Sequence, residues 1–131
     1  MSLIIDTCNV LHRTGILPPD LAGIDEHGLV RLLLTSRYRN RESLLICDGG
    51  PSEARISREH PNVRYVFGRP EQTADDLIMD FIERSSAPKR LLVVTSDRRI
   101  AATARRRRCR ILDSDTFLEQ LAQDAQGRES F

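Results

Sequence analysis

Carboxylates follow each of the short apolar runs of this 131-residue sequence. They are Asp6, Asp48, the pair Asp75 and Asp76, Asp97, and Asp113. If the runs are strands of one parallel sheet, their carboxyl ends meet at one edge, and these side chains gather there. Carboxylates so close together repel one another unless a cation lies among them. Oxygen ligands favour Mg²⁺ or Mn²⁺ over zinc, so the pattern predicts metal-dependent phosphoryl transfer.

The elements that would position these acids alternate along the chain. Strands are expected at 3–5, 44–47, 63–67, 91–94 and 111–112, and helices at 29–39, 73–84, 98–107 and 116–123. Near-continuous apolar strands separated by helices indicate a parallel sheet covered on both faces. Alternating polarity at 63–67 predicts an edge strand. We expect one domain over residues 1–123 and a polar, frayed tail over 124–131.

A local structural role is the alternative for each acid taken singly. Aspartate is common in turns and at helix N-termini. Thr73 would cap its helix with Asp76 as the capping-box acid, and Asp113 would help to start the last helix. The recurrence of acids after successive strands favours the functional interpretation.

Composition excludes several classes of protein. The charged residues nearly cancel, with a net charge of +1, and the apolar fraction of 40% excludes a disordered chain. Three cysteines without paired spacing argue against a disulfide framework and a zinc site, and Cys47 and Cys109 are expected in the core. No glycine-rich phosphate loop occurs. With no signal pattern and no apolar run near ~20 residues, we expect a cytoplasmic protein without membrane contact.

Four short motifs resemble those of NYN domains, in the YacP-like branch of the PIN-like nuclease superfamily. They are Leu3-Ile4-Ile5-Asp6 with Asn9-Val10, Leu45-Ile46-Cys47-Asp48, Thr73-Ala74-Asp75-Asp76, and Thr95-Ser96-Asp97. Their order and spacing cover about residues 3–121. Gln72 stands where this branch often has glutamate. A carboxylate that would support the metal ligands from outside is therefore missing at that position.

The resemblance implies a fold, an activity and a set of site residues. The fold is an α/β, Rossmann-like (PIN-like) three-layer sandwich with a mostly parallel five-stranded sheet of order 3-2-1-4-5. The activity is that of an Mg²⁺- or Mn²⁺-dependent ribonuclease acting on RNA. Asp6, Asp75 and Asp97 would be catalytic acids that hold the metal, Asp76 a further metal acid, and Asn9, Asp48 and Ser96 supporting residues.

Arginine dominates the basic residues, with nineteen arginines and a single lysine. Arg98 and Arg99, next to Asp97, are the expected RNA-binding pair. The run Arg105–Arg108 has two interpretations: an RNA-binding rim, or a solvated helix end whose cations complement the helix dipole. Aromatic residues are few, which predicts weak base preference.

Two further functions stay open from the sequence. The arginine excess and the short chain also suit a non-catalytic RNA-binding module that needs a second subunit or a partner protein. A phosphatase or receiver domain fits less well, because Cys8 stands where a D-x-D phosphatase needs an acid.

Overall fold

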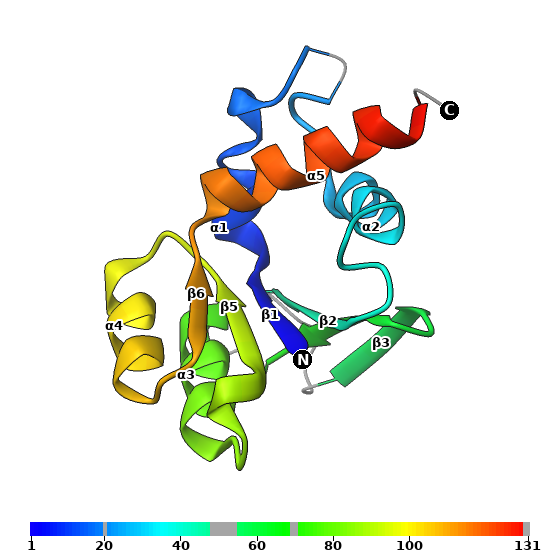
Figure 1. Cartoon of the computed structure of the whole chain (residues 1–131). Coiled ribbons are helices and arrows are strands. Elements are labelled where there is room, and N and C mark those ends of the chain that lie inside the picture. Colours follow the sequence, from blue (N-terminus) through cyan, green and yellow to red (C-terminus); the bar gives the residue numbers. More distant parts are fainter. Residues whose placement is uncertain (20, 48–54, 69–70, 130–131) are drawn as a thin grey trace.

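A single mixed sheet forms the centre of the protein (Figure 1). The computed structural model describes residues 1–19, 21–47, 55–68 and 71–129. The strand order is β3-β4-β2-β1-β5-β6. The strands are β1 (Ser2–Asp6), β2 (Glu42–Cys47), β3 (Arg55–His60), β4 (Val63–Phe67), β5 (Leu91–Val94) and β6 (Arg110–Leu112).

Five of these strands are parallel, and their order is the one expected. Numbered along the chain without β3, they run 3-2-1-4-5, so β1 lies between β2 and β5. Asp6 pairs with Ile46, and Ile5 with Val94, which places Asp6 at the carboxyl edge of the sheet. The central strands are buried on both faces, as their apolar sequences require.

The strand β3 was not expected from the sequence. It pairs antiparallel with β4, so the prediction that residues 63–67 form a sheet edge is wrong. The sequence of β3, Arg-Ile-Ser-Arg-Glu-His, carries one apolar residue and gives no buried-strand signal. An antiparallel edge strand does not need the continuous apolar run of a central parallel strand, because one of its faces can stay in water.

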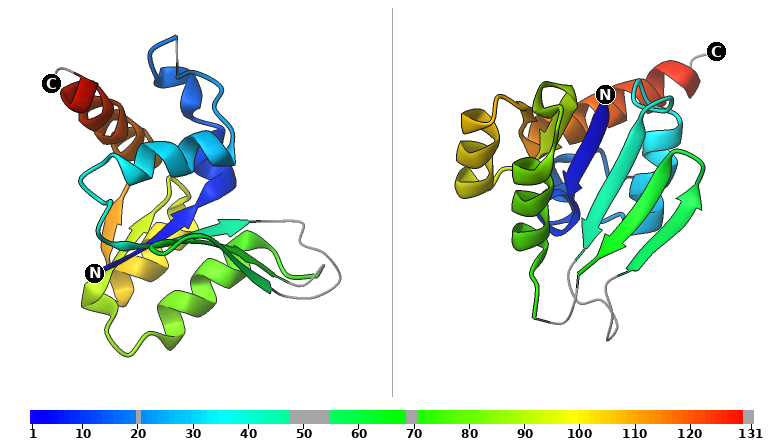
Figure 2. Two further views of the ribbon diagram at one scale, coloured as in Figure 1. Left: turned by 90° about the vertical axis from the view of Figure 1, so that its right-hand side faces the viewer. Right: turned by 90° about the horizontal axis from the view of Figure 1, so that it is seen from below.

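One face of the sheet is covered by α1 (Thr7–Leu11), α2 (Glu26–Leu34) and α5 (Ser114–Glu129), as Figure 2 shows. Their apolar side chains pack on Leu3, Ile5 and Leu45 from the sheet. Asp25 caps α2 by accepting a hydrogen bond from Gly28 N–H at 2.9 Å. A short 3₁₀ turn, η1 (Thr14–Ile16), follows α1. Burial of these apolar side chains stabilises the packing of α2 and α5 against the sheet.

The opposite face is covered by α3 (Ala74–Arg84) and α4 (Arg98–Arg106), with the 3₁₀ turn η2 (Pro88–Arg90) before β5. Ile78, Ile82 and Ile100 are fully buried there against Ile4 and Val93. The two helix-covered faces make the expected three-layer sandwich. Cys47 and Cys109 are buried as predicted, and none of the three cysteines, all in described residues, forms a disulfide.

Helix boundaries differ from the expected ones mainly at α2 and α5. The helix expected at 29–39 spans Glu26–Leu34, because the capping residue Asp25 starts it earlier. The helix expected at 116–123 spans Ser114–Glu129, so residues 124–129 are helical rather than frayed. Asp124 in this extension receives three hydrogen bonds from Arg37. The division into a domain over 1–123 and a tail stays a prediction.

Candidate functional site

Asp6, the last residue of β1, is a buried carboxylate at the carboxyl edge, with 4% of its surface exposed. Its Oδ2 accepts a hydrogen bond from Thr95 Oγ1 at 2.8 Å. Burial raises the pKa of Asp6, and the hydrogen bond from Thr95 opposes this rise. The negative charges of Asp75 and Asp97 raise the pKa further, whereas the Asn9 N–H group lowers it. Three of the predicted acids therefore interact electrostatically.

Asp97 lies after β5 and is the N-cap of α4. Its Oδ1 accepts hydrogen bonds from Arg99 N–H at 2.8 Å and Ile100 N–H at 3.0 Å. Both bonds use the same oxygen, as is usual for an N-cap aspartate. The structural and functional interpretations of Asp97 are thus compatible, because its charge also acts on Asp6.

Asp75 and Asp76 occupy the first turn of α3. Asp75 is half-buried, and its charge acts on Asp6. Asp76 is exposed and forms the expected capping box: its N–H donates to Thr73 Oγ1 at 3.1 Å, and its carboxylate accepts from Thr73 N–H at 3.4 Å. The local role that the sequence offered as an alternative is therefore real for Asp76, and its metal-binding role stays a prediction.

Asn9, on α1, connects three elements at this edge through hydrogen bonds. Its Oδ1 accepts hydrogen bonds from Ser96 N–H at 2.9 Å and from the Ser114 hydroxyl at 2.7 Å. The Ser114 N–H in turn donates to Ser96 Oγ at 3.1 Å. The start of α1, the loop after β5 and the start of α5 are consequently held in one network, and the supporting roles of Asn9 and Ser96 stay predictions.

Of the two remaining acids of the pattern, the structure describes one. Asp48 lies outside the described residues. Asp113 caps α5, accepting from Thr116 N–H at 2.8 Å and from the Thr116 hydroxyl at 3.1 Å. Asp113 therefore has the local role anticipated for it.

A metal ion at this edge would have few protein ligands. Among the described residues, no three histidine, cysteine, aspartate or glutamate side chains lie close enough to hold an ion together. Mg²⁺ commonly keeps several waters and binds one or two carboxylates together with substrate phosphates. The carboxylates around Asp6 fit such an ion in charge and chemistry, although they do not form an all-protein cage.

The arginines near this edge are exposed. Arg98 and Arg99 occupy the first turn of α4, directly after Asp97, with their side chains in solvent. Their RNA-binding role stays a prediction.

The run Arg105–Arg108 lies at the other end of α4, where two of its residues contact α3. Arg107 donates to the carbonyl oxygens of Ile82, Glu83 and Ser85, which satisfies the C-terminal end of α3. Arg106 pairs with Glu83. These contacts join α4 to the C-terminal end of α3 through two of the four arginines, a role that neither interpretation of the run anticipated.

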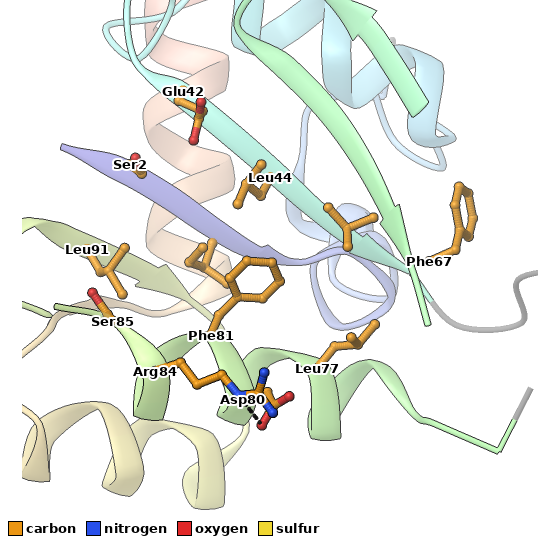
Figure 3. A pocket seen from close by; sticks show the side chains of 12 residues that line it. Ser2, Glu42, Leu44, Phe67, Leu77, Asp80, Phe81, Arg84, Ser85 and Leu91 are labelled. Atoms are coloured by element: carbon orange, nitrogen blue, oxygen red, sulfur yellow. Dashed lines mark ion pairs between the residues drawn. The ribbon is translucent and has the colours of Figure 1, made fainter. Parts of the chain in front are cut away.

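A groove of about 750 Å³ lies between α3 and the sheet (Figure 3). Leu44, Phe67 and Phe81 line it, and the ion pair of Asp80 with Arg84 borders it. None of the predicted site residues lines this groove. The lining is mainly apolar and also contains the carboxylates of Glu42 and Asp80.

Sequence reasoning did not assign roles to Thr95 and Ser114. Both are buried polar residues next to the acids, with exposures of 1% and 0%. The signal available was weak: a hydroxyl residue directly after an apolar strand, and another after Asp113. Only the packing of β1, β5 and α5 shows that these hydroxyls bond to Asp6 and Asn9.

Comparison with known proteins agrees with this architecture. The fold resembles crystal structures of Rae1 (YacP) from Bacillus subtilis, with a TM-score of 0.69 at 16% identity over 99% of this chain and 78% of that one. A tryptophan-to-leucine mutant of the same protein gives a TM-score of 0.71 at 15% identity, over 99% and 79% of the two chains. No curated protein matches in sequence. A family model for the YacP-like NYN domain matches residues 26–130, so the chain belongs to the YacP-like NYN domain family.

Proposed function

We propose that this protein is a metal-dependent ribonuclease that hydrolyses RNA phosphodiester bonds at the carboxyl edge of its sheet. The observation that carries the proposal is the buried Asp6 carboxylate, whose pKa is raised by burial and by the charges of Asp75 and Asp97. Such a cluster is costly without a cation, and perturbed carboxylates of this kind are typical of catalytic sites. Membership of a nuclease-like, RNA-related family supports the same activity.

Asp6, Asp75 and Asp97 are the residues that would hold Mg²⁺ or Mn²⁺, one or two of them directly and the rest through waters that such an ion keeps. When bound, the ion would activate a water and stabilise the leaving oxygen of the phosphodiester. The chain's own residues keep the acids in position. Thr95 orients the Asp6 carboxylate by donating to it, and the backbone of α4 fixes one oxygen of Asp97. Asp76 is proposed as a further metal acid and Asp48 as a supporting acid of the same site.

Arg98 and Arg99 are proposed to bind the RNA backbone beside the acids. Their exposure leaves both guanidinium groups accessible to phosphates. The scarcity of aromatic residues predicts cleavage with little base preference, because aromatic stacking is a main route to base recognition in single strands.

The test is hydrolysis of end-labelled RNA in Mn²⁺ or Mg²⁺, with EDTA as the metal-free condition. Asp6→Asn, Asp75→Asn and Asp97→Asn should each lower the rate by about 100-fold or more, since each removes a charge that would hold the ion. Asp80→Asn is the matched control: Asp80 is an acid of α3 that pairs with Arg84 outside the cluster. Equal cleavage by the wild type and the three site variants would contradict the proposal.

A non-catalytic RNA-binding module is the second candidate function. It is favoured by the finding that no three potential ligands gather around one point in the described part of the chain. RNA binding that is unchanged by EDTA, with no cleavage under Mg²⁺, Mn²⁺, Co²⁺ or Ca²⁺, would establish this alternative. The hydrolysis experiment above therefore separates the two candidates.

A further inference from the structure

The orientation of the Asn9 side-chain amide is fixed by its partners. The Ser96 backbone N–H, which can only donate, lies 2.9 Å from one terminal atom of the amide. That atom must therefore be the oxygen, so the usual ambiguity between the two ends of an amide does not arise here. The Ser114 hydroxyl donates to the same oxygen at 2.7 Å.

These two bonds leave the oxygen of Asn9 without acceptor capacity. An amide oxygen carries two lone pairs, and each is occupied by a protein donor. The amide nitrogen lies at the other end of the group and carries two N–H donors. Within the described residues, Asn9 Nδ2 donates no hydrogen bond, and Asn9 is partly exposed.

Asn9 also lies directly beside the acids. Its backbone N–H interacts with the Asp6 carboxylate and lowers the pKa of that group. Ser96, which donates to its amide, is the neighbour of Asp97. An amide N–H donor at this edge suits an anionic oxygen and is repelled by a cation.

We propose that Asn9 contacts the RNA as a hydrogen-bond donor to a phosphate oxygen, not as a metal ligand, and that Ser114 is the positioning residue that fixes its amide. The inference rests on the proposed function, since it takes RNA as the ligand of this edge. Ser114 acts through Asn9: its hydroxyl is fully buried, and the cap of α5 is supplied by Asp113 instead.

The first experiment compares Asn9→Asp and Asn9→Ala with the wild type. Asp keeps oxygens for Ser96 and Ser114 but removes the N–H donors, whereas Ala removes the whole amide. Affinity for a non-cleavable RNA is measured by fluorescence anisotropy in Ca²⁺ and in EDTA, and Mn²⁺ affinity by calorimetry without RNA. Both variants should bind RNA about 10-fold more weakly, and Asn9→Asp should bind Mn²⁺ at least as tightly as the wild type.

A series of salt concentrations separates two effects of Asn9→Asp on RNA affinity, the loss of the N–H donors and the added negative charge. Repulsion of RNA by the new carboxylate is screened at high salt, but the missing hydrogen bond is not. The loss of RNA affinity in Asn9→Asp should therefore approach the loss in Asn9→Ala as the salt concentration is raised. Wild-type RNA affinity and cleavage in Asn9→Asp would overturn the inference. A loss of Mn²⁺ affinity in Asn9→Ala with RNA affinity intact would overturn it equally.

The second experiment tests the positioning role of Ser114 with a double-mutant cycle. Ser114→Ala should weaken RNA binding several-fold in the wild-type background and have no further effect in Asn9→Ala. Ser36→Ala is the matched control, because Ser36 is also fully buried and hydrogen-bonded, in the turn after α2. Its loss of stability should be similar, with RNA affinity unchanged. Additive effects of Ser114→Ala and Asn9→Ala would overturn the positioning role.

Failure of the proposed function gives a different result from failure of this inference. A wild-type protein that binds RNA but never cleaves it contradicts the proposed hydrolysis alone, and the affinities of the Asn9 variants still decide the inference. Absence of any RNA binding by the wild type overturns both.

Discussion

Thr95 donates its hydroxyl hydrogen to Asp6 on the neighbouring strand, with 2.8 Å between Thr95 Oγ1 and Asp6 Oδ2. The same hydroxyl oxygen accepts a hydrogen bond from Asp97 N–H at 3.1 Å. One buried side chain therefore connects the acid at the end of β1 with the acid at the start of α4. The distance between these two carboxylates is set by backbone pairing in the sheet and by this hydroxyl, not by the acids themselves.

Thr95→Val should destabilise the metal-free protein. The substitution keeps the shape of the side chain but leaves the buried Asp6 carboxylate with one donor fewer. Hydrogen bonds to charged groups contribute about 1.5–3 kcal/mol, so the free energy of unfolding should fall by about that amount at neutral pH. Urea unfolding measures it. Thr95→Ser retains the hydroxyl and should recover most of the loss, whereas equal stability of all three proteins would contradict the role of Thr95.

The pKa of Asp6 predicts a specific pH dependence of stability. Because the folded protein raises this pKa, the stability contributed by Asp6 is fully present below its unfolded pKa and is lost as pH rises through its folded pKa. Asp6→Asn, which cannot ionise, should therefore be more stable than the wild type at neutral pH without metal, by about 1.4 kcal/mol per unit of pKa rise.

Urea unfolding of both proteins from about pH 4 to pH 8 tests this dependence. The advantage of Asp6→Asn should shrink toward the acidic end, where the wild-type carboxyl is protonated. Millimolar Mn²⁺ should raise the melting temperature of the wild type more than that of the variant. A wild type that is more stable than Asp6→Asn throughout the metal-free series would contradict the raised pKa.

Apolar runs and the residues after them are local signals, and they predicted a parallel sheet and the edge at which the acids gather. The strand order was implied by the resemblance to NYN domains, and the structure has that order. The charges of Asp75 and Asp97 act on Asp6, and the metal-binding roles of the three acids stay predictions. The polar contacts that orient them were not predictable, since Thr95 and Ser114 reach Asp6 and Asn9 across 89 and 105 residues of chain. Similarly, β3 is recognised by its pairing with β4, because its own composition carries no strand signal.

Asp97 has two roles that substitution can separate. Asparagine caps helices about as well as aspartate, so Asp97→Asn should keep the bonds to Arg99 and Ile100 while removing a charge that repels Asp6. Its metal-free melting temperature should equal or exceed that of the wild type. Asp97→Ala loses the cap as well and should be less stable by about 1 kcal/mol.

Both Asp97 variants should show a smaller rise in melting temperature with Mn²⁺ than the wild type. Thermal unfolding with and without millimolar Mn²⁺ measures the two effects in one series. A full Mn²⁺-induced rise in Asp97→Asn would show that Asp97 acts only as a helix cap.

Arg108, two residues after the end of α4, has a conformation that favours glycine. Its φ of 64° is left-handed, and the bonds Cys109 N–H to Ala104 O and Arg108 N–H to Arg105 O make a Schellman motif around it. Arg108→Gly should raise the free energy of unfolding by about 0.5–1 kcal/mol, because it relieves the strain of a Cβ there. Arg105→Gly, inside the same helix, should instead lower it by about 1 kcal/mol. Chemical denaturation of both variants checks the opposite signs.

Arg98 and Arg99 should account for part of the salt dependence of RNA binding. Each phosphate contact to a single strand contributes about 0.7 to the slope of log K against log salt, so Arg98→Gln with Arg99→Gln should reduce the slope by about 1.4. The matched control is Arg31→Gln with Arg41→Gln, which makes the same change in net charge at exposed positions in α2 and before β2. Anisotropy titrations over a series of salt concentrations give the slopes. A general effect of charge would lower the slope equally in the two double variants, whereas contact at the carboxyl edge would lower it more in the variant of Arg98 and Arg99. Equal slopes would therefore place the RNA elsewhere.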